Sequence, residues 1–259
     1  MAIRLKSPGQ IERMRRAGRI VRLVLDRAGE MIAPGMTTEE LDAEAESLCR
    51  RHHARCLFKG VPGRRGAGPF PGNLCVSIND EVVHGIPSSR QVRDGDIVSV
   101  DFGVELDGWC GDAAETYIVG EVDDDVRRLV DVTRNCLSLA VSMSGPGRKW
   151  SDVASAMQGY IESEGFSVVR EFVGHGIGSR MHEDPKVPNF VSRELLARDI
   201  RLEPGMTLAV EPMVNMGPPE VRCDADGWTI RTCDSRPSAH FEDTLAITAD
   251  GASVLTDGK

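Results

Sequence analysis

Two aspartates, Asp101 and Asp112, lie on the two arms of a predicted β-hairpin, at a spacing that could hold a metal ion. Between them, Asp107-Gly108 favours a two-residue type I′ turn, because both positions of such a turn need a positive φ. This turn would place Asp101 opposite Ala114 and make the two aspartates diagonal neighbours, about 6–8 Å apart at Cβ. Two carboxylates at that separation repel by roughly 2–3 kcal/mol at an effective dielectric of about 20. Hairpin geometry alone leaves two interpretations open, a cation between the aspartates or two solvated side chains.

The chain repeats its order of elements, and the repeat supplies another acid. Two predicted helices separated by Pro34-Gly35 precede the strand of Asp101, and two separated by Pro146-Gly147 precede the strand of Glu211. The two acids occupy the same place in their strands, since VSV precedes one and LAV precedes the other. We therefore expect two similar halves that carry an acid at the same position.

A second predicted turn, Asp226-Gly227, lies between Glu211 and a further acid, Glu242. The residue numbers of the two glutamates have the same sum as those of the two turn residues. Residues with equal sums pair in an antiparallel ladder without a bulge, so the two glutamates would lie opposite each other. Prolines lie between the two glutamates, and proline cannot donate a hydrogen bond to a ladder. The equal sums therefore indicate either a real pairing or a coincidence of numbering. The prolines that make an unbulged ladder doubtful are Pro218, Pro219 and Pro237.

A histidine flanked by glycines, His175 in EFVGHGIG, completes the candidate metal ligands. A predicted strand runs into it, and the glycines favour a side chain presented at a crowded site. A single histidine of this kind is more often a satisfied core residue, but four converging acids favour a metal ligand. His84 and His182 also lie beside turns that contain glycine or proline. His182-Glu183 does not extend to the His-Glu-x-x-His motif, which excludes a zincin helix.

Two Asp, two Glu and one His form a ligand set for hard or borderline divalent metals such as Mn(II), Fe(II) or Co(II). Four carboxylates balance the charge of two dications, so the count favours a dinuclear site. Such a site lowers the pKa of a bridging water and stabilises the oxyanion formed when a carbonyl is attacked, which is the chemistry of hydrolysis. His84 and His182 would then orient the substrate or stabilise the tetrahedral intermediate.

The elements that must position these residues follow from apolar periodicity and from turn residues. We expect helices over residues 7–33, 37–53, 123–143 and 150–164, the second of which opens with a capping box at Thr37 and Glu40. Besides the hairpin, we expect strands at 74–79, 82–87, 168–173 and 206–212, and a final β region at 228–248. Loops are expected over 59–72, which is rich in glycine and proline, and over 174–205.

Composition describes an ordinary globular protein of 259 residues with a net charge of −9, which disfavours binding to nucleic acid or to an anionic membrane. No stretch approaches the roughly 18 apolar residues of a membrane span, and the N-terminus lacks the pattern of a signal peptide. The 7 cysteines are odd in number and form no Cys-x-x-Cys pair, which indicates reduced thiols in a cytoplasmic protein. We expect a monomer.

The motifs around these residues resemble those of type I methionine aminopeptidases, which have the pita-bread fold. The resemblance covers nearly the whole chain, from KSPGQIERMRRAG to FEDTLAIT. The motifs that carry it are NLCVSINDEVVHGIP, GDIVSVDFG, DGWCGDAAETYIVG, FSVVREFVGHGIG, MHEDP, PGMTLAVEPMVN, DGWT and HFEDT. It implies an α+β fold with a central curved antiparallel sheet and a pseudo-twofold repeat of two helix-helix-β halves. The halves would span about 7–120 and 123–250 within a single catalytic domain of residues 1–259.

The resemblance also implies a role for each candidate residue. The metal ligands would be Asp101, Asp112, His175, Glu211 and Glu242, with Asp112 and Glu242 bridging two divalent ions of cobalt, manganese, iron or zinc. Glu211 would shuttle a proton, and His84 and His182 would act as catalytic residues on the substrate side. The residues that would bind the substrate methionine are His84, Cys75, His182, Phe70, Met181 and Trp228. The implied reaction is the hydrolytic removal of the initiator methionine from nascent polypeptides whose second residue is small, with the ribosome as a transient partner.

The sequence departs from the family pattern at three places near the pocket. The segment 59–72 is longer than usual, Met181 stands where an aromatic residue is usual, and His240 stands where glutamine is common. These departures bear on substrate specificity and rate and leave the ligand set unchanged. The long segment contains Arg64-Arg65, and it either controls substrate access or forms a solvated surface loop.

Two alternatives remain open from the sequence. One is a pita-bread peptidase directed to X-Pro bonds, but such enzymes generally carry an extra N-terminal domain, whereas this sequence begins directly with the first helical half. The other is a catalytically inactive homologue that binds nascent chains or ribosomes. Such proteins lose metal ligands, and all five candidates are present here, so the sequence favours an active enzyme.

Overall fold

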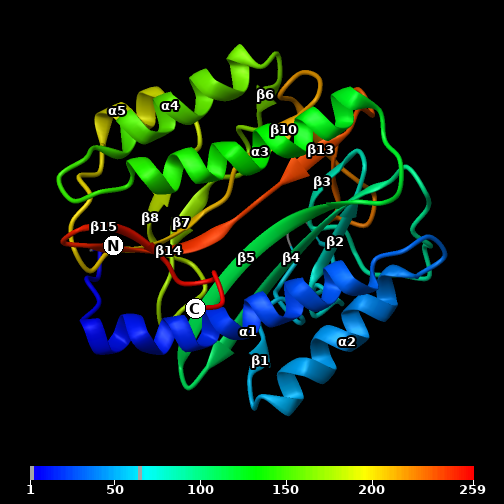
Figure 1. Cartoon of the computed structure of the whole chain (residues 1–259), viewed down its shortest axis with the longest axis horizontal. Coiled ribbons are helices and arrows are strands. Elements are labelled where there is room, and N and C mark those ends of the chain that lie inside the picture. Colours follow the sequence, from blue (N-terminus) through cyan, green and yellow to red (C-terminus); the bar gives the residue numbers. More distant parts are fainter. Residues whose placement is uncertain (1–2, 64–65) are drawn as a thin grey trace.

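The computed structural model describes residues 3–63 and 66–259, and two pairs of helices flank its strands (Figure 1). The helices are α1 (Pro8–Met31), α2 (Thr38–Arg51), α3 (Asp124–Met143), α4 (Trp150–Ser163) and the short α5 (Arg193–Ala197). The first strands are β1 (Arg55–Cys56), β2 (Cys75–Ile78), β3 (Glu81–Val83), β4 (Ile97–Leu106) and β5 (Trp109–Ile118). The later strands are β6 (Ser167–Val168), β7 (Gly174–Gly176), β8 (Glu183–Val187), β9 (Thr207–Val210), β10 (Met213–Asn215), β11 (Val221–Cys223), β12 (Ile230–Thr232), β13 (Ser238–His240), β14 (Asp243–Thr248) and β15 (Gly251–Val254).

The first two helices begin where the sequence predicts, because side chains satisfy their first backbone N–H groups. Ser7 and Gln10 form a capping box at α1, in which the Ser7 N–H donates to Gln10 Oε1 at 2.9 Å. At α2 the Thr37 N–H donates to Glu40 Oε2 at 2.7 Å, which confirms the predicted capping box.

Each helix pair buries one apolar face against its own strands, so the molecule has two main cores. Helix α1 packs on β4 and β5, and α3 packs on β10, β13 and β15. Figure 1 shows the α1–α2 pair and the α3–α4 pair on opposite sides of the strands. The two layers explain the helical periodicity of both halves. Within the described parts of the chain, no helix combines the length and apolarity that a membrane span requires.

The long β4–β5 hairpin has the predicted register. Asp107 and Gly108 adopt φ values of 50° and 78°, as a type I′ turn requires. Leu106 pairs with Trp109, and Asp101 pairs with Ala114. The ladder runs without a bulge to Ile97, so the side chains of Asp101 and Asp112 lie on the same face, as predicted.

The second half also keeps the register expected from its turn. Cys223 pairs with Ile230, Met213 with His240 and Val210 with Asp243, and each pair has the same sum of residue numbers. The prolines therefore interrupt the ladder without shifting it. Glu211 and Glu242 lie in the gap between two of these ladders and so face each other in register. The connection at Asp226-Gly227 is a longer loop than predicted, closed by the Asp224 N–H donating to Thr229 O at 2.8 Å.

Strand β5 joins the two halves along a short seam. The Ala114 N–H donates to Glu242 O at 3.2 Å, and the Glu242 N–H donates to Ala114 O at 2.9 Å. On one side of this bridge the Asp112 N–H donates to Thr244 Oγ1 at 3.0 Å, and Thr244 Oγ1 donates to Asp112 O at 2.8 Å. Asp112 and Glu242 are therefore held next to each other by the Ala114–Glu242 backbone bonds and by the Thr244 hydroxyl.

The structure differs from the sequence prediction around His175. The strand expected at 168–173 is limited to β6, and the segment 174–205 contains β7, β8 and α5 rather than an uninterrupted loop. The sequence of β7 is rich in glycine and lacks apolar alternation, which is why a loop was predicted there. Its glycines are required by packing, since a Cβ at Gly174 would lie 2.3 Å from Ala209 O and one at Gly176 would lie 2.2 Å from Asp184 O.

The strand expected at 82–87 is also shorter than predicted. It ends at Val83 because His84 adopts a left-handed conformation with φ 61°. Gly85 then passes so close to β2 that a Cβ would lie 2.1 Å from Val76 O. The chain is therefore irregular from His84 onward, where a strand was expected to continue to residue 87.

We predict that Gly18→Ala destabilises the protein by about 1–3 kcal/mol, because overpacking forces backbone shifts. A Cβ at Gly18 would lie 2.0 Å from Leu255 O, and α1 also touches Gly111 of β5 here. Gly9→Ala on the same helix is the matched control, since nothing lies within 4 Å of its Cβ. Gly9→Ala should leave stability unchanged or raise it by up to about 1 kcal/mol. Urea unfolding at fixed metal concentration tests this, and equal stabilities of the two variants would contradict it.

Candidate metal centre

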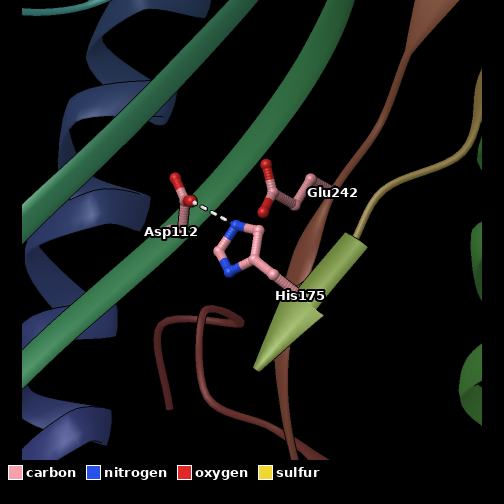
Figure 2. A group of neighbouring side chains, drawn as sticks. All are labelled: Asp112, His175 and Glu242. Atoms are coloured by element: carbon pink, nitrogen blue, oxygen red, sulfur yellow. Dashed lines mark ion pairs between the residues drawn. The ribbon is translucent and has the colours of Figure 1, made fainter. Parts of the chain in front are cut away.

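Three predicted ligands from separate segments meet in one buried cluster. Asp112 lies on β5, His175 lies on β7, and Glu242 lies between β13 and β14. Each offers one ligand atom, and these atoms all lie within 4.8 Å of one another. Figure 2 shows the three side chains pointing toward one shared space. The arrangement is the one that a metal ion requires, with ligands converging from both sides of the seam.

The other two predicted ligands border the same space. His175 Nε2 lies 3.7 Å from Asp112 Oδ2 and 3.8 Å from Glu211 Oε1, so Glu211 approaches the same imidazole nitrogen as Asp112. Asp101 pairs with Ala114, whose other neighbour is Glu242. The structure therefore brings together all five residues that sequence analysis proposed as ligands.

Several carboxylate oxygens in this cluster have no hydrogen-bond partner among the described residues. They are buried, and they are Asp101 Oδ1, Asp112 Oδ1 and Glu242 Oε1. An unsatisfied buried polar atom costs about 1–3 kcal/mol, and more when the group is charged. Three such atoms aimed at one space indicate that something other than protein binds there.

The environment of these acids opposes their ionisation. Burial and neighbouring carboxylates raise the pKa values of Asp101, Asp112 and Glu242 well above their ordinary values. The pKa of Glu211 rises to about 8 for the same reasons, burial first and the charge of Asp101 second. Without a counter-charge the cluster therefore holds protons, and bound cations would replace them.

His175 presents the nitrogen that a metal needs. Burial, and then the neighbouring His182, lower the pKa of His175 to about 4, so its imidazole is neutral. Its Nδ1 hydrogen-bonds to Gly176 O at 2.9 Å, and because a carbonyl only accepts, Nδ1 carries the proton. Nε2 therefore directs a lone pair toward the acids. This is the tautomer that metal-binding histidines adopt.

The two histidines that are predicted to lie on the substrate side, His84 and His182, make ring contacts near the cluster. The His182 ring centroid lies 4.3 Å from that of His175. His84 makes edge contacts with Phe172 at 5.3 Å and with Trp228 at 6.4 Å between ring centroids. Its left-handed backbone orients the side chain, and strain of this kind is typical of functional sites.

The predicted pocket residues lie at three places. Cys75 is buried on β2 and pairs with Asp101, while Phe70 packs edge-on against Trp228 at 5.1 Å between ring centroids. Met181 lies over Gly103 together with Phe58, since a Cβ at Gly103 would be 2.4 Å from Met181 Cε and 2.8 Å from Phe58 Cε1.

The long segment 59–72 is tied to the second half by Trp228. The Trp228 Nε1–H donates to Gly68 O at 2.9 Å, and Ala67 lies against Gly227. The Arg64-Arg65 pair of this segment lies outside the described residues. The segment 66–72 is thus held against Trp228 and Gly227.

His240, one of the three predicted departures from the family pattern, lies beside Glu211. It is 2% exposed, its Nε2 has no hydrogen-bond partner among the described residues, and this atom lies 4.0 Å from Glu211 Oε2. Burial, and then His84, lower its pKa to about 3. Its position two residues before Glu242 was a usable signal, because alternate residues of a strand share a face.

Comparison with known proteins decides the family. Residues 12–249 match the model of metallopeptidase family M24. The chain belongs to metallopeptidase family M24. Membership agrees with the candidate metal-binding cluster, because this family consists of metal-dependent peptidases.

Individual proteins with known names or structures are similar to this chain over most of its length. Methionine aminopeptidase 1 of Bacillus subtilis (strain 168) is 46% identical over 251 residues, which cover 97% of this chain and 98% of that protein. A crystal structure of methionine aminopeptidase from Thermotoga maritima has a TM-score of 0.92 at 43% identity, covering 98% of this chain and 99% of that chain. An Xaa-Pro dipeptidase from Bacillus anthracis shares the fold alone, with a TM-score of 0.75 at 23% identity and 62% of that chain covered. The predicted α+β pita-bread fold is thereby confirmed.

We predict that the metal-free M24 protein loses stability as the pH rises from about 4.5 to 8. The pKa of Glu211 is raised from 4.5 to about 8, so the folded state binds its proton more tightly than the unfolded state does. The stabilisation is then complete below the unfolded pKa and is lost as the pH rises through the folded one. Thermal unfolding in a chelator measures this effect against Glu211→Gln, which cannot titrate. The stability advantage of the wild type over the variant should shrink toward pH 8, and a constant difference would contradict the assignment.

Proposed function

We propose that this M24 protein is a methionine aminopeptidase that removes N-terminal methionine from polypeptides whose second residue is small. The observation that carries the proposal is the convergence of Asp112, His175 and Glu242, bordered by Glu211 and Asp101. Relatives at 42–46% identity over nearly their full length carry the name methionine aminopeptidase, which supports the same activity here.

We assign the five acidic and histidine ligands to two divalent ions of manganese, iron, cobalt or zinc. Asp101, Asp112, His175, Glu211 and Glu242 would together hold the ions, with Asp112, His175 and Glu242 supplying the ligand atoms that lie within 4.8 Å of one another. The ions would act as Lewis acids toward the scissile carbonyl and lower the pKa of a nearby water. Four carboxylates and one imidazole fit such ions, because they supply oxygen and nitrogen donors whose charge two dications balance.

The remaining chemistry belongs to side chains of the chain itself. Glu211 accepts the proton of the attacking water and delivers it to the leaving amine as the C–N bond breaks. His182, next to His175, donates a hydrogen bond to the carbonyl oxygen as negative charge develops there. His84 binds the substrate on the side of Trp228 and Phe172.

The pocket for the methionine side chain would be formed by Cys75, Phe70, Trp228 and Met181. A polarisable thioether packs well against aromatic rings and another methionine. Because Met181 is flexible, this wall of the pocket adapts more readily than an aromatic wall would. We assign Met181 to side-chain specificity and exclude it from the metal ligands.

The biological setting of the proposal follows from the reaction. The substrates would be the N-termini of nascent polypeptides in the cytoplasm, met on or near the ribosome, with no role for nucleic acid or membrane. The whole chain would act as a single monomeric catalytic domain of residues 1–259, built from halves of about 7–120 and 123–250.

We predict that Asp112→Ala abolishes cleavage of a Met-Ala-Ser peptide at saturating manganese. Loss of a bridging carboxylate should cost more than the 10–100-fold, as an order of magnitude, that changes in outer-shell partners cost. Asp131→Ala, which removes an exposed carboxylate of α3, is the control and should retain wild-type activity. Substantial turnover by Asp112→Ala at saturating metal would overturn the dinuclear assignment.

The same assay separates the two alternative functions. An X-Pro-directed peptidase would cleave an Ala-Pro peptide and leave Met-Ala-Ser intact. An inactive binding homologue would cleave neither peptide across a panel of divalent metals. Either result would replace the proposed activity, whereas selective cleavage after methionine supports it.

We predict that Trp228→Phe alters substrate access through segment 66–72 without changing the metal site. The substitution keeps an aromatic ring but removes the hydrogen bond to Gly68 O, worth about 1 kcal/mol or roughly a fivefold effect. Peptide kcat/KM should change by about that factor, while manganese affinity by calorimetry stays within about twofold. Trp109→Phe at the hairpin end of β5 is the matched control. A changed metal affinity with unchanged kcat/KM would contradict this role.

A further inference from the structure

A buried ion pair links the N-terminal segment to the turn that carries His182. Lys6 Nζ donates to Glu183 Oε2 at 2.6 Å, and the two side chains are 5% and 4% exposed. Burial would raise the pKa of Glu183, but the hydrogen bond and charge of Lys6 lower it. A charge this deeply buried needs its partner, because an isolated one is strongly unfavourable in the interior.

Lys6 is itself held firmly in place. Its backbone N–H donates to Gly205 O at 2.7 Å, and the Gly205 N–H donates to Ile247 O at 2.8 Å. Lys6 Nζ also donates to Arg4 O at 3.0 Å. The ammonium group is therefore fixed relative to β9 and β14. Strand β9 ends directly before Glu211, and β14 begins directly after Glu242.

Glu183 organises the turn from the other side. Its Oε1 accepts the Arg180 N–H at 3.2 Å, and the ion pair covers Gly178, where a Cβ would lie 2.5 Å from Lys6 Cε and 2.7 Å from Glu183 Oε1. Gly178 O in turn accepts the Cys110 N–H of β5 at 2.8 Å. The turn 178–183 is thus wrapped around one carboxylate, with Met181 and His182 on its outer part.

We propose that Lys6 is a positioning residue for His182, which it acts on through Glu183 and the turn 178–183. The proposal rests on the proposed function for its kinetic consequence, because His182 is assigned there to the scissile carbonyl. Lys6 touches neither substrate nor metal ligand among its described contacts. Its role is to fix the distance between the His182 and His175 rings, whose centroids are 4.3 Å apart.

The test replaces Lys6 by methionine, which keeps an unbranched stem over Gly178 and removes the charge. Lys6→Met should lower kcat for Met-Ala-Ser by about 10–100-fold, since misplacing a substrate-orienting group by about 1 Å costs up to that much. Manganese stoichiometry and affinity by calorimetry should stay within about twofold of wild type. Arg4→Met, which removes an exposed positive charge two residues away, is the matched control and should behave as wild type.

A double-mutant cycle separates positioning from general stability. In a His182→Ala background, Lys6→Met should change kcat by less than about twofold, because the residue that it positions is already absent. An equal loss of kcat in both backgrounds would overturn the proposal. If Lys6→Met does not fold, Lys6→Met/Glu183→Gln takes its place in the cycle, because that variant leaves no unpaired buried charge.

A structural readout keeps this proposal distinct from the proposed function. If the wild type cleaves no methionine peptide, the proposed function fails, and a crystal structure of Lys6→Met still tests the positioning role. Displacement of His182 relative to His175 in that structure supports the role of Lys6. An unchanged His182 overturns it, whatever the activity of the wild type.

Discussion

Mutual repulsion among buried carboxylates is the constraint on which this structure depends. Burial raises the pKa values of all four acids, Asp101, Asp112, Glu211 and Glu242. The next largest cause in each case is the charge of another acid in the cluster. A fold that buries four acids together is unfavourable unless protons or cations neutralise them. Protons satisfy the cluster at low pH, and two dications would satisfy it near neutrality. The cluster of acids therefore destabilises the folded state when it is empty, and cations that bind only the folded state would stabilise it.

The strands hold the acids together against that repulsion. Asp112 and Glu242 lie on either side of a seam whose backbone groups are all paired with each other or with Thr244. Catalytic groups on rigid strands are positioned more precisely than groups on loops. The substrate-side groups are different, since His182 lies on a turn and depends on the buried Lys6–Glu183 pair for its position. Thus ligands rely on the sheet, and the histidine near the substrate relies on an ion pair.

Much of this could be predicted from the sequence, because the relevant signals are local. The Asp107-Gly108 turn sets the register of β4 and β5, and the second-half register persists past its prolines. Glycine-rich β7 could not be recognised, since its glycines are required by the close approach of Ala209 rather than by any local preference. The Lys6–Glu183 pair could likewise not be predicted from the sequence, because the two residues are 177 positions apart and no periodic pattern links them.

The family assignment and the site geometry support each other through different observations. The first rests on residues 12–249 taken together, while the second rests on a few atoms that lack partners within the described chain. Departures from the family pattern, Met181 and His240, lie next to the site without replacing a ligand. His240 Nε2 lies 4.0 Å from Glu211 Oε2.

The central claim is that two cations resolve the repulsion among these acids. Anomalous diffraction at the manganese edge, from crystals grown with excess manganese, tests it most directly. We expect two peaks about 3.5–4 Å apart, both contacted by Asp112 and Glu242, with His175 and Glu211 at one and Asp101 at the other. No peak among these five residues, in crystals of a protein that still cleaves methionine peptides with manganese, would contradict the account.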